Sequence, residues 1–185
     1  VKIKKIAEKF GAEVPFIRPK KYSKDSSKDL DVFKHYLEWQ KKNNLKEPDI
    51  ILHLRVTTPI RDIKIIKNAI KRFIKNKKAS SLRSFRYSIF SPYKMWKFKN
   101  LKFVEPVVIL KSNSESHSYG RQELPKTLNH IGMIDILRPK KTIYQDSMCG
   151  TRVMPLIFEK KDLKNYVDID NNNDLKIAKQ IIKKL

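Results

Sequence analysis

The sequence predicts an α/β domain built on a largely parallel sheet, and three observations support this class. Residues 49–55 are a short apolar run between Pro48 and a Thr-Thr-Pro turn, which is typical of a buried strand. Apolar residues then recur at helical spacing between 63 and 74, and residues 79–86 are a further strand candidate. Strand, helix and strand in this order are typical of a βαβ unit, whose two strands run parallel.

The other elements follow from periodicity and from turn residues. We expect a helix over residues 3–10 that ends at Gly11, and a second helix from 29 or 31 to about 42 with an acidic first turn. Thr58 is the expected N-cap of the helix after the first strand, with Pro59 at its first position. Further expected elements are strands at 107–110, 132–137, 153–158 and 166–170, and a last helix with apolar residues from 175 to 185.

Length and composition indicate one domain spanning residues 1–185. The chain is 40% apolar, which is enough for a core. Residues 91–138 interrupt the alternation of strands and helices, so we expect them to form an inserted subdomain or an oligomerisation arm. One cysteine, Cys149, excludes an internal disulfide, and no apolar run approaches the roughly 20 residues of a membrane span. A cytoplasmic protein that does not bind membranes is the expectation.

The net charge of +23 points to polyanionic partners, but this indication is weak. Of the 42 basic residues 33 are lysine, a bias that an AT-rich coding sequence also produces, and they are spread over the whole chain. Tyr87, Tyr93, Trp96 and Phe98 interleave with basic residues, which is compatible with stacking on nucleic acid. We keep a nucleic-acid-binding module as an alternative and do not expect nucleic acid to be the partner.

Two carboxylates near the C-terminus could bind a metal ion. Asp168 and Asp170 are two residues apart, so on an extended segment both side chains lie on one face. A pair of this kind at a strand end can hold Mg²⁺, which prefers oxygen ligands and keeps several waters. The alternative is an acidic turn in which Asp174 lies near the cap of the last helix.

A second set of candidates follows the first strand. In α/β sheets ligands bind at the carboxyl ends of the strands, where helix N-termini attract anions. The residues expected to face this crevice are Arg55, Thr57, Thr58 and Arg61. Arginine is scarce here, and a guanidinium binds carboxylate or phosphate through two hydrogen bonds, although a surface ion pair is an equal alternative for any single arginine. His35 and His53 are interpreted as packed rather than catalytic.

Taken together, these segments resemble the acylneuraminate cytidylyltransferases, the CMP-sialic acid synthetases and their relatives for legionaminic and pseudaminic acid. The resemblance extends through the whole chain in order. It rests on residues 11–19 (GAEVPFIRP), 25–27 (DSS), 53–61 (HLRVTTPIR), 81–84 (SLRS), 91–95 (SPYKM), 121–125 (RQELP), 132–137 (GMIDIL) and 166–170 (YVDID).

The resemblance implies a Rossmann-like, three-layer nucleotide-diphosphosugar-transferase fold and a homodimer with an inserted dimerisation arm. It also implies a Mg²⁺-dependent reaction in which CTP and a nonulosonic acid give the CMP-sugar and pyrophosphate. By resemblance Asp168 and Asp170 are the catalytic metal-binding pair, Arg18 and Ser27 contact the nucleotide, and residues 55–61 cover the substrate. Arg121 and Gln122 correspond to the sugar and dimer region.

Two features set this sequence apart from the family. The opening strand and the Gly-Ser-Lys type phosphate loop have no counterpart, so we expect an N-terminally truncated version of the fold with impaired activity in this chain alone. Val56, Leu128 and Ile131 replace residues usual in the family, which favours the alternative of a noncatalytic relative that keeps the fold and the dimer surface.

Overall fold

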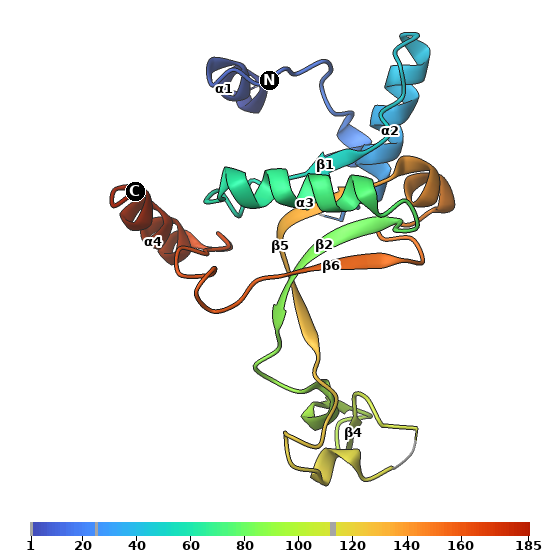
Figure 1. Cartoon of the computed structure of the whole chain (residues 1–185), viewed down its shortest axis with the longest axis vertical. Helices are drawn as coiled ribbons and strands as arrows, with labels where there is room; N and C mark the ends of the chain where they lie inside the picture. Colours follow the sequence, from blue (N-terminus) through green and yellow to red (C-terminus); the bar gives the residue numbers. More distant parts are fainter. Residues whose placement is uncertain (1, 25, 112–113) are drawn as a thin grey trace.

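The computed structural model describes residues 2–24, 26–111 and 114–185, and these ranges form a mixed four-stranded sheet, a separate hairpin and four α-helices (Figure 1). The strands of the main sheet are β1 (Ile51–His53), β5 (Leu128–Leu137), β2 (Ser81–Tyr87) and β6 (Val153–Ile157), in this spatial order.

The expectation of a largely parallel sheet is wrong, because β5 lies between β1 and β2 and runs antiparallel to both. Only β2 and β6 form a parallel pair. After β2 the chain leaves the sheet through a long projecting segment and returns at the same edge, so the returning strand must run in the opposite direction. β1 and β2 do point the same way, as the strand–helix–strand pattern predicts, but they are not neighbours.

Helices cover both faces of the sheet. α3 (Ile63–Lys75) packs through Ala69 and Phe73 against a cluster that includes Ile136 of β5. α2 (Asp29–Lys42) packs through Leu37 against Leu137, the next residue of β5. Successive residues of a strand point to opposite faces, so the two helices lie on opposite sides of the sheet and the expected three layers are present.

Both expected N-terminal helices are confirmed, but the expected start of the third is wrong. α1 (Lys2–Lys9) ends before Gly11, which has φ +85°, and α2 begins at Asp29. α3 begins at Ile63 and not at Pro59, since Asp62 is its N-cap and accepts a hydrogen bond from the Lys64 N–H at 2.6 Å. Thr58 instead belongs to the loop that leads from β1 to α3.

The described parts of the segment between β2 and β5, residues 88–111 and 114–127, project away from the main sheet and are called the arm here (Figure 1). It contains an antiparallel hairpin of β3 (Trp96–Phe98) and β4 (Val104–Pro106). The strand expected at 107–110 is therefore wrong, because β4 ends at Pro106 and one further backbone hydrogen bond, from Val107 to Met95, closes the hairpin. Several apolar side chains of the arm are exposed, among them Phe98 at 82% and Phe103 at 65%.

The C-terminal region is partly as expected. β6 confirms the strand predicted at 153–158, whereas residues 166–170 form an irregular loop and not a strand. α4 (Asn172–Ile182) is confirmed and begins with a capping box, in which Asn171 and Asp174 satisfy each other's backbone N–H groups. Within the ranges that the structure describes, no helix is long and apolar enough to cross a membrane.

Candidate functional site

An irregularity in β5 organises the region around the carboxyl end of β1. Pairing with β2 joins Arg83 to Asp135 and then Phe85 to His130, so Ser84 alone stands opposite residues 131–134. Gly132 in this bulge has φ +62°, a conformation that favours glycine. Three successive bulge carbonyls accept hydrogen bonds from side chains of other segments: Ile131 from the Tyr166 hydroxyl (3.0 Å), Gly132 from the Thr58 hydroxyl (3.4 Å) and Met133 from Arg61 Nε (2.7 Å).

Arg61 holds the loop between β1 and α3 in place. In addition to the Met133 carbonyl, its guanidinium binds the Thr58 hydroxyl at 2.6 Å and the carbonyl oxygen of Arg55. Burial lowers the pKa of Arg61 below its ordinary value. The structure thus directs three of the contacts of this arginine into the protein, where they satisfy carbonyl and hydroxyl groups of the loop.

Arg55 connects the same loop to α2. Its Nη2 lies 3.2 Å from Oδ2 of Asp29, the first residue of α2, and the pair is partly exposed. The arginine stem crosses Gly132 so closely that a Cβ there would lie 2.9 Å from Arg55 Cδ. Glycine at this bulge position therefore serves both the backbone conformation and the passage of the Arg55 side chain.

The two candidate carboxylates lie beside this loop. The backbone N–H of Ile169 donates a hydrogen bond of 2.8 Å to the carbonyl oxygen of Thr57. Asp168 is half-buried and its Oδ1 has no hydrogen-bond partner in the described part of the chain, whereas Asp170 is exposed. The loop therefore brings Asp168 and Asp170 to the segment that carries Arg55, Thr57, Thr58 and Arg61.

The acidic-turn alternative is confirmed for Asp174, which caps α4. Its Oδ2 accepts hydrogen bonds from the N–H groups of Asp170 at 3.0 Å and Asn171 at 3.1 Å, so this carboxylate belongs to the helix cap. The buried, unpartnered oxygen of Asp168 is of a different kind, because a buried acceptor without a donor is unfavourable and a cation would satisfy it.

Asp168 and Asp170 supply carboxylate oxygens, the kind of ligand that could hold a magnesium ion. Mg²⁺ is bound in proteins through one or two carboxylates, with waters and substrate phosphates completing its shell. In the described ranges no cluster of three or more His, Cys, Asp or Glu side chains could hold a metal. The pair fits a metal ion that is shared with a phosphate ligand better than one enclosed by the protein alone.

Tyr166 and Arg86 flank the carboxylate loop, and the sequence did not single out either for this site. Burial, together with the negative charges of Asp168 and Asp170, raises the pKa of the Tyr166 hydroxyl, while Arg86 opposes this effect. Arg86 Nε is buried and has no hydrogen-bond partner among the residues that the structure describes. Its position at the end of β2, next to the expected crevice, was the signal available in the sequence.

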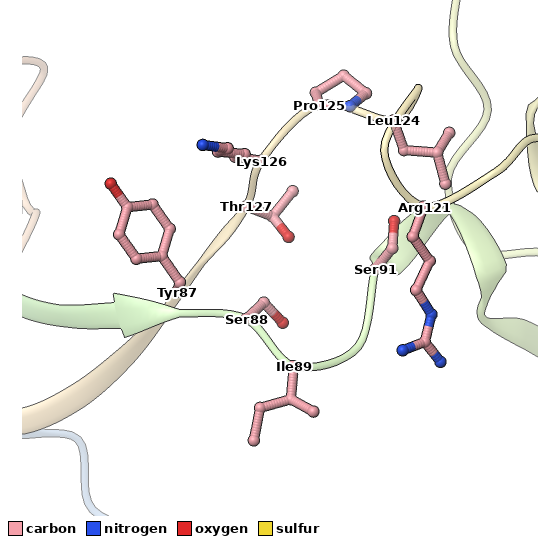
Figure 2. Close-up of a pocket in the computed structure, with 9 residues that line it drawn as sticks. All are labelled: Tyr87, Ser88, Ile89, Ser91, Arg121, Leu124, Pro125, Lys126 and Thr127. Atoms are coloured by element: carbon pink, nitrogen blue, oxygen red, sulfur yellow. The ribbon is translucent and has the colours of Figure 1, made fainter. Parts of the chain in front are cut away.

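A small pocket lies where the arm joins the sheet, and Figure 2 shows its lining. It has a volume of about 250 Å³ and is formed by the end of β2, the start of the arm and the segment that returns to β5. Arg121 lines it, as does Ser91, whose Oγ is buried with no partner in the described chain. Gln122 is exposed and lies outside the lining.

The expected nucleotide contacts lie elsewhere. Arg18 borders a largely apolar groove of about 670 Å³ between α1 and α2. The Ser27 hydroxyl accepts a hydrogen bond of 2.9 Å from the Lys24 N–H in the loop before α2. Among the contacts of the described residues, none joins Arg18, Ser27, Arg121 or Gln122 to the Asp168 loop, so the candidates fall into separate regions.

A buried polar network crosses the α2 face of the sheet, and sequence reasoning missed it. Asp135 of β5 binds His130 Nε2 at 2.9 Å and Arg83 Nη2 at 3.3 Å. Burial would raise the pKa of Asp135, but the hydrogen bond from His130 and the charge of Arg83 hold it below its ordinary value. His53 lies opposite Asp135 on β1, and burial lowers its pKa. A single aspartate inside the apolar run 131–137 was the available signal.

With this geometry in view, comparison with known proteins indicates the fold. A CMP:2-keto-3-deoxy-manno-octonic acid synthetase, solved in complex with CTP, superimposes with a TM-score of 0.56. The match covers 100% of this chain and 78% of the synthetase chain, at 13% sequence identity. The two chains share a fold. No protein-family model and no curated protein matches the sequence. The expected fold class is thus supported in part, as a mixed α/β fold that resembles the fold of this synthetase.

Proposed function

We propose that this protein is a cytidylyltransferase that transfers CMP from CTP to a nonulosonic, sialic-type acid and releases pyrophosphate. The observation that carries the proposal is the hydrogen bond between Ile169 and Thr57. Within a fold like that of a CMP-sugar synthetase, it brings a carboxylate pair to the carboxyl end of β1, the edge where α/β sheets bind ligands.

The reaction makes a bond from a hydroxyl oxygen of the sugar acid to the α-phosphorus of CTP and breaks the bond from that phosphorus to the bridging oxygen. The pyrophosphate leaves, and the hydroxyl proton passes to solvent or to a nearby base. Such a transfer needs two anions aligned and their charge spread, without a covalent protein intermediate. Asp168 and Asp170 would hold Mg²⁺, which lowers the repulsion between the phosphates and the incoming acid.

The arm offers a location for the sugar acid. The pocket at its base contains Arg121 and the unpartnered Ser91 hydroxyl, and a guanidinium together with a hydroxyl suits a carboxylated, hydroxyl-rich ligand. Residues 91–138 would then act as a sugar-binding and dimerisation subdomain. Its exposed side chains, Phe98 and Phe103 among them, provide the apolar surface on which a second copy would dock.

Calorimetric titration with CTP and Mg²⁺ tests the nucleotide site directly. We expect binding that is selective over ATP and that weakens by about tenfold or more in Asp168→Asn, because this change removes one of the two charged metal ligands. Asp162→Asn, the same change in the same connection between β6 and α4, is the matched control. Duplex DNA is the third ligand, and equal binding of DNA and nucleotides would show that the titration reports only the +23 charge.

A second candidate, a noncatalytic relative, is favoured by the contacts of Arg61. Its guanidinium binds the Met133 and Arg55 carbonyls, so these donors do not face an incoming anion. A relative of this kind would bind CTP without turnover. Measuring pyrophosphate release with CTP and a sialic-type acid separates the two functions, since only the cytidylyltransferase gives a signal that disappears in Asp168→Asn.

A further inference from the structure

A basic cavity lies at the end of the strands opposite the candidate site. Ser80 directly precedes β2, Thr151 and Arg152 directly precede β6, and Lys140 and Lys141 lie just beyond the end of β5. The candidate carboxylates lie near the carboxyl end of β1 instead. β1, β2 and β6 run in the same direction. The cavity, at the amino ends of β2 and β6, and the candidate site, at the carboxyl end of β1, therefore lie at opposite ends of the strands.

The lining of this cavity is strongly biased in charge. Its volume is about 580 Å³, within the range of small-molecule sites. Four of the lining residues are cationic and none is acidic; the cations are Lys78, Lys140, Lys141 and Arg152. In the described ranges, none of these four takes part in an ion pair.

The wall of the cavity is fixed by the backbone. Gly150 has φ +65°, and a Cβ there would lie 2.4 Å from the Lys141 carbonyl oxygen and 2.5 Å from Ser80 Cβ. The Ser147 hydroxyl accepts hydrogen bonds from the N–H groups of Cys149 at 3.1 Å and Gly150 at 2.9 Å. This turn therefore packs tightly against the start of β2 and holds Thr151 and Arg152 beside the lysines.

Two acidic residues line a neighbouring cavity that shares two of these lysines. Glu47 and Asp49 line a smaller cavity of about 210 Å³ that shares Lys140 and Lys141. Glu47 accepts a hydrogen bond of 3.2 Å from the Tyr144 hydroxyl. Neither carboxylate lines the basic cavity, so Lys78 and Arg152 face it without an acidic neighbour in its wall.

We propose that this cavity binds a small multivalent phosphate anion of the pyrophosphate or triphosphate class. Four cations exceed what a single carboxylate or monovalent anion would neutralise, and the Ser80, Ser147 and Thr151 hydroxyls add polar groups that suit phosphate oxygens. No aromatic side chain lines the cavity, which distinguishes it from a surface that stacks nucleic-acid bases. The site is separate from the proposed catalytic one.

Titration of the protein with pyrophosphate in EDTA, at fixed ionic strength, tests the inference without a contribution from a metal at Asp168. We expect one binding event that weakens by about tenfold or more in Lys78→Ala/Arg152→Ala. Both side chains are exposed, so the double variant is expected to fold, and circular dichroism checks this. Lys99→Ala/Lys102→Ala removes the same charge from the arm and should leave the affinity unchanged.

Four outcomes would overturn the inference. The first is that pyrophosphate does not bind. The second is that binding falls equally in both double variants, which would indicate general charge attraction only. With Mg²⁺ in place of EDTA, binding that is lost in Asp168→Asn and kept in Lys78→Ala/Arg152→Ala would assign the anion to the candidate catalytic site, leaving the proposed function intact. Duplex DNA affinity that falls in the cavity variant while pyrophosphate affinity does not would identify a nucleic-acid surface instead.

Discussion

Arg83 and Asp135 face each other across β2 and β5, with Nη2 3.3 Å from Oδ2 and only 4% of the Asp135 side chain exposed. His130 binds the other carboxylate oxygen from beyond the β5 bulge. A buried carboxylate with two cationic or hydrogen-bonding partners is stable only as a complete set, because removing one member leaves the others unpaired away from water.

We therefore expect Asp135→Ala to lower the free energy of unfolding by about 3 kcal/mol or more. Urea unfolding monitored by circular dichroism measures the change. Glu105→Ala removes the carboxylate of the exposed Lys97 pair on the arm and should change stability by less than about 1 kcal/mol. Equal small effects in both variants would contradict the role of the Asp135 network.

Stability should also decrease as the pH falls below neutrality, because of His53. Burial and the positive charges of Arg55 and Arg83 lower its pKa in the folded protein, against the opposing effect of Asp29 and Asp135. Between this lowered pKa and the ordinary value near 6.5, the unfolded chain binds the proton more readily, so folding weakens as pH falls.

Urea unfolding at pH 7.0 and 5.0 in wild type and in His53→Gln measures this contribution. We expect the variant to lose less stability than the wild type between the two pH values. An identical pH dependence in both proteins would assign the effect to other groups. Asp135, whose pKa is also lowered, adds its own loss only at more acidic pH, as the pH falls from its unfolded pKa through its folded one.

Asp62→Ala should destabilise the protein by about 1 kcal/mol, because the Lys64 N–H loses its acceptor at the first turn of α3. Asp62→Ser, which retains an N-cap oxygen, should restore most of the loss. If thermal unfolding of the alanine variant is unchanged, the helix start assigned to Ile63 is incorrect.

Arg61→Ala tests whether this residue stabilises the loop or binds substrate. Loss of its bonds to the Met133 and Arg55 carbonyls should lower the free energy of unfolding by about 2 kcal/mol. Stability is measured in urea without ligand. Unchanged stability combined with lost CTP binding would place Arg61 at the ligand instead.

Charge on the arm should separate the proposed dimer. Phe98→Lys/Phe103→Lys introduces two cations on its exposed apolar surface, and we expect sedimentation velocity to show monomers where the wild type forms dimers. Ile177→Lys on α4, another exposed apolar position, is the control and should leave the dimer intact. A wild type that is already monomeric would refute the dimer.

Local patterns predicted most elements but not the way in which they assemble. The apolar periodicity of α2 and the short runs of strand-forming residues in β2 and β6 are properties of neighbouring residues, so they can be read directly from the sequence. The position of β5 between β1 and β2 depends on the path of the arm, and no local signal encodes it. The expected strand at 166–170 was wrong because, among the described residues, a single backbone hydrogen bond, from Ile169 to Thr57, joins it to the loop after β1.

The sequence likewise predicted some residues of the candidate site and missed others. Spacing identified Asp168 and Asp170, and the turn after the first strand identified residues 55–61, which the structure places together. Arg18, Gln122 and Arg121 were linked to them by resemblance, and within this chain they lie in other regions. Asp135, Arg86 and Tyr166 were missed because their importance depends on partners more than 20 residues away, or on a bulge whose register the sequence does not reveal.

The bulge in β5 also acts as a spacer of fixed length. Side chains alternate along a strand, so deleting one residue from 131–133 would turn every following position of β5 to the other face. Asp135 would then point into the apolar layer beneath α3, and Ile136 would meet Arg83 in its place. The number of residues in this short stretch, and not only their chemistry, therefore decides which face of the sheet is charged.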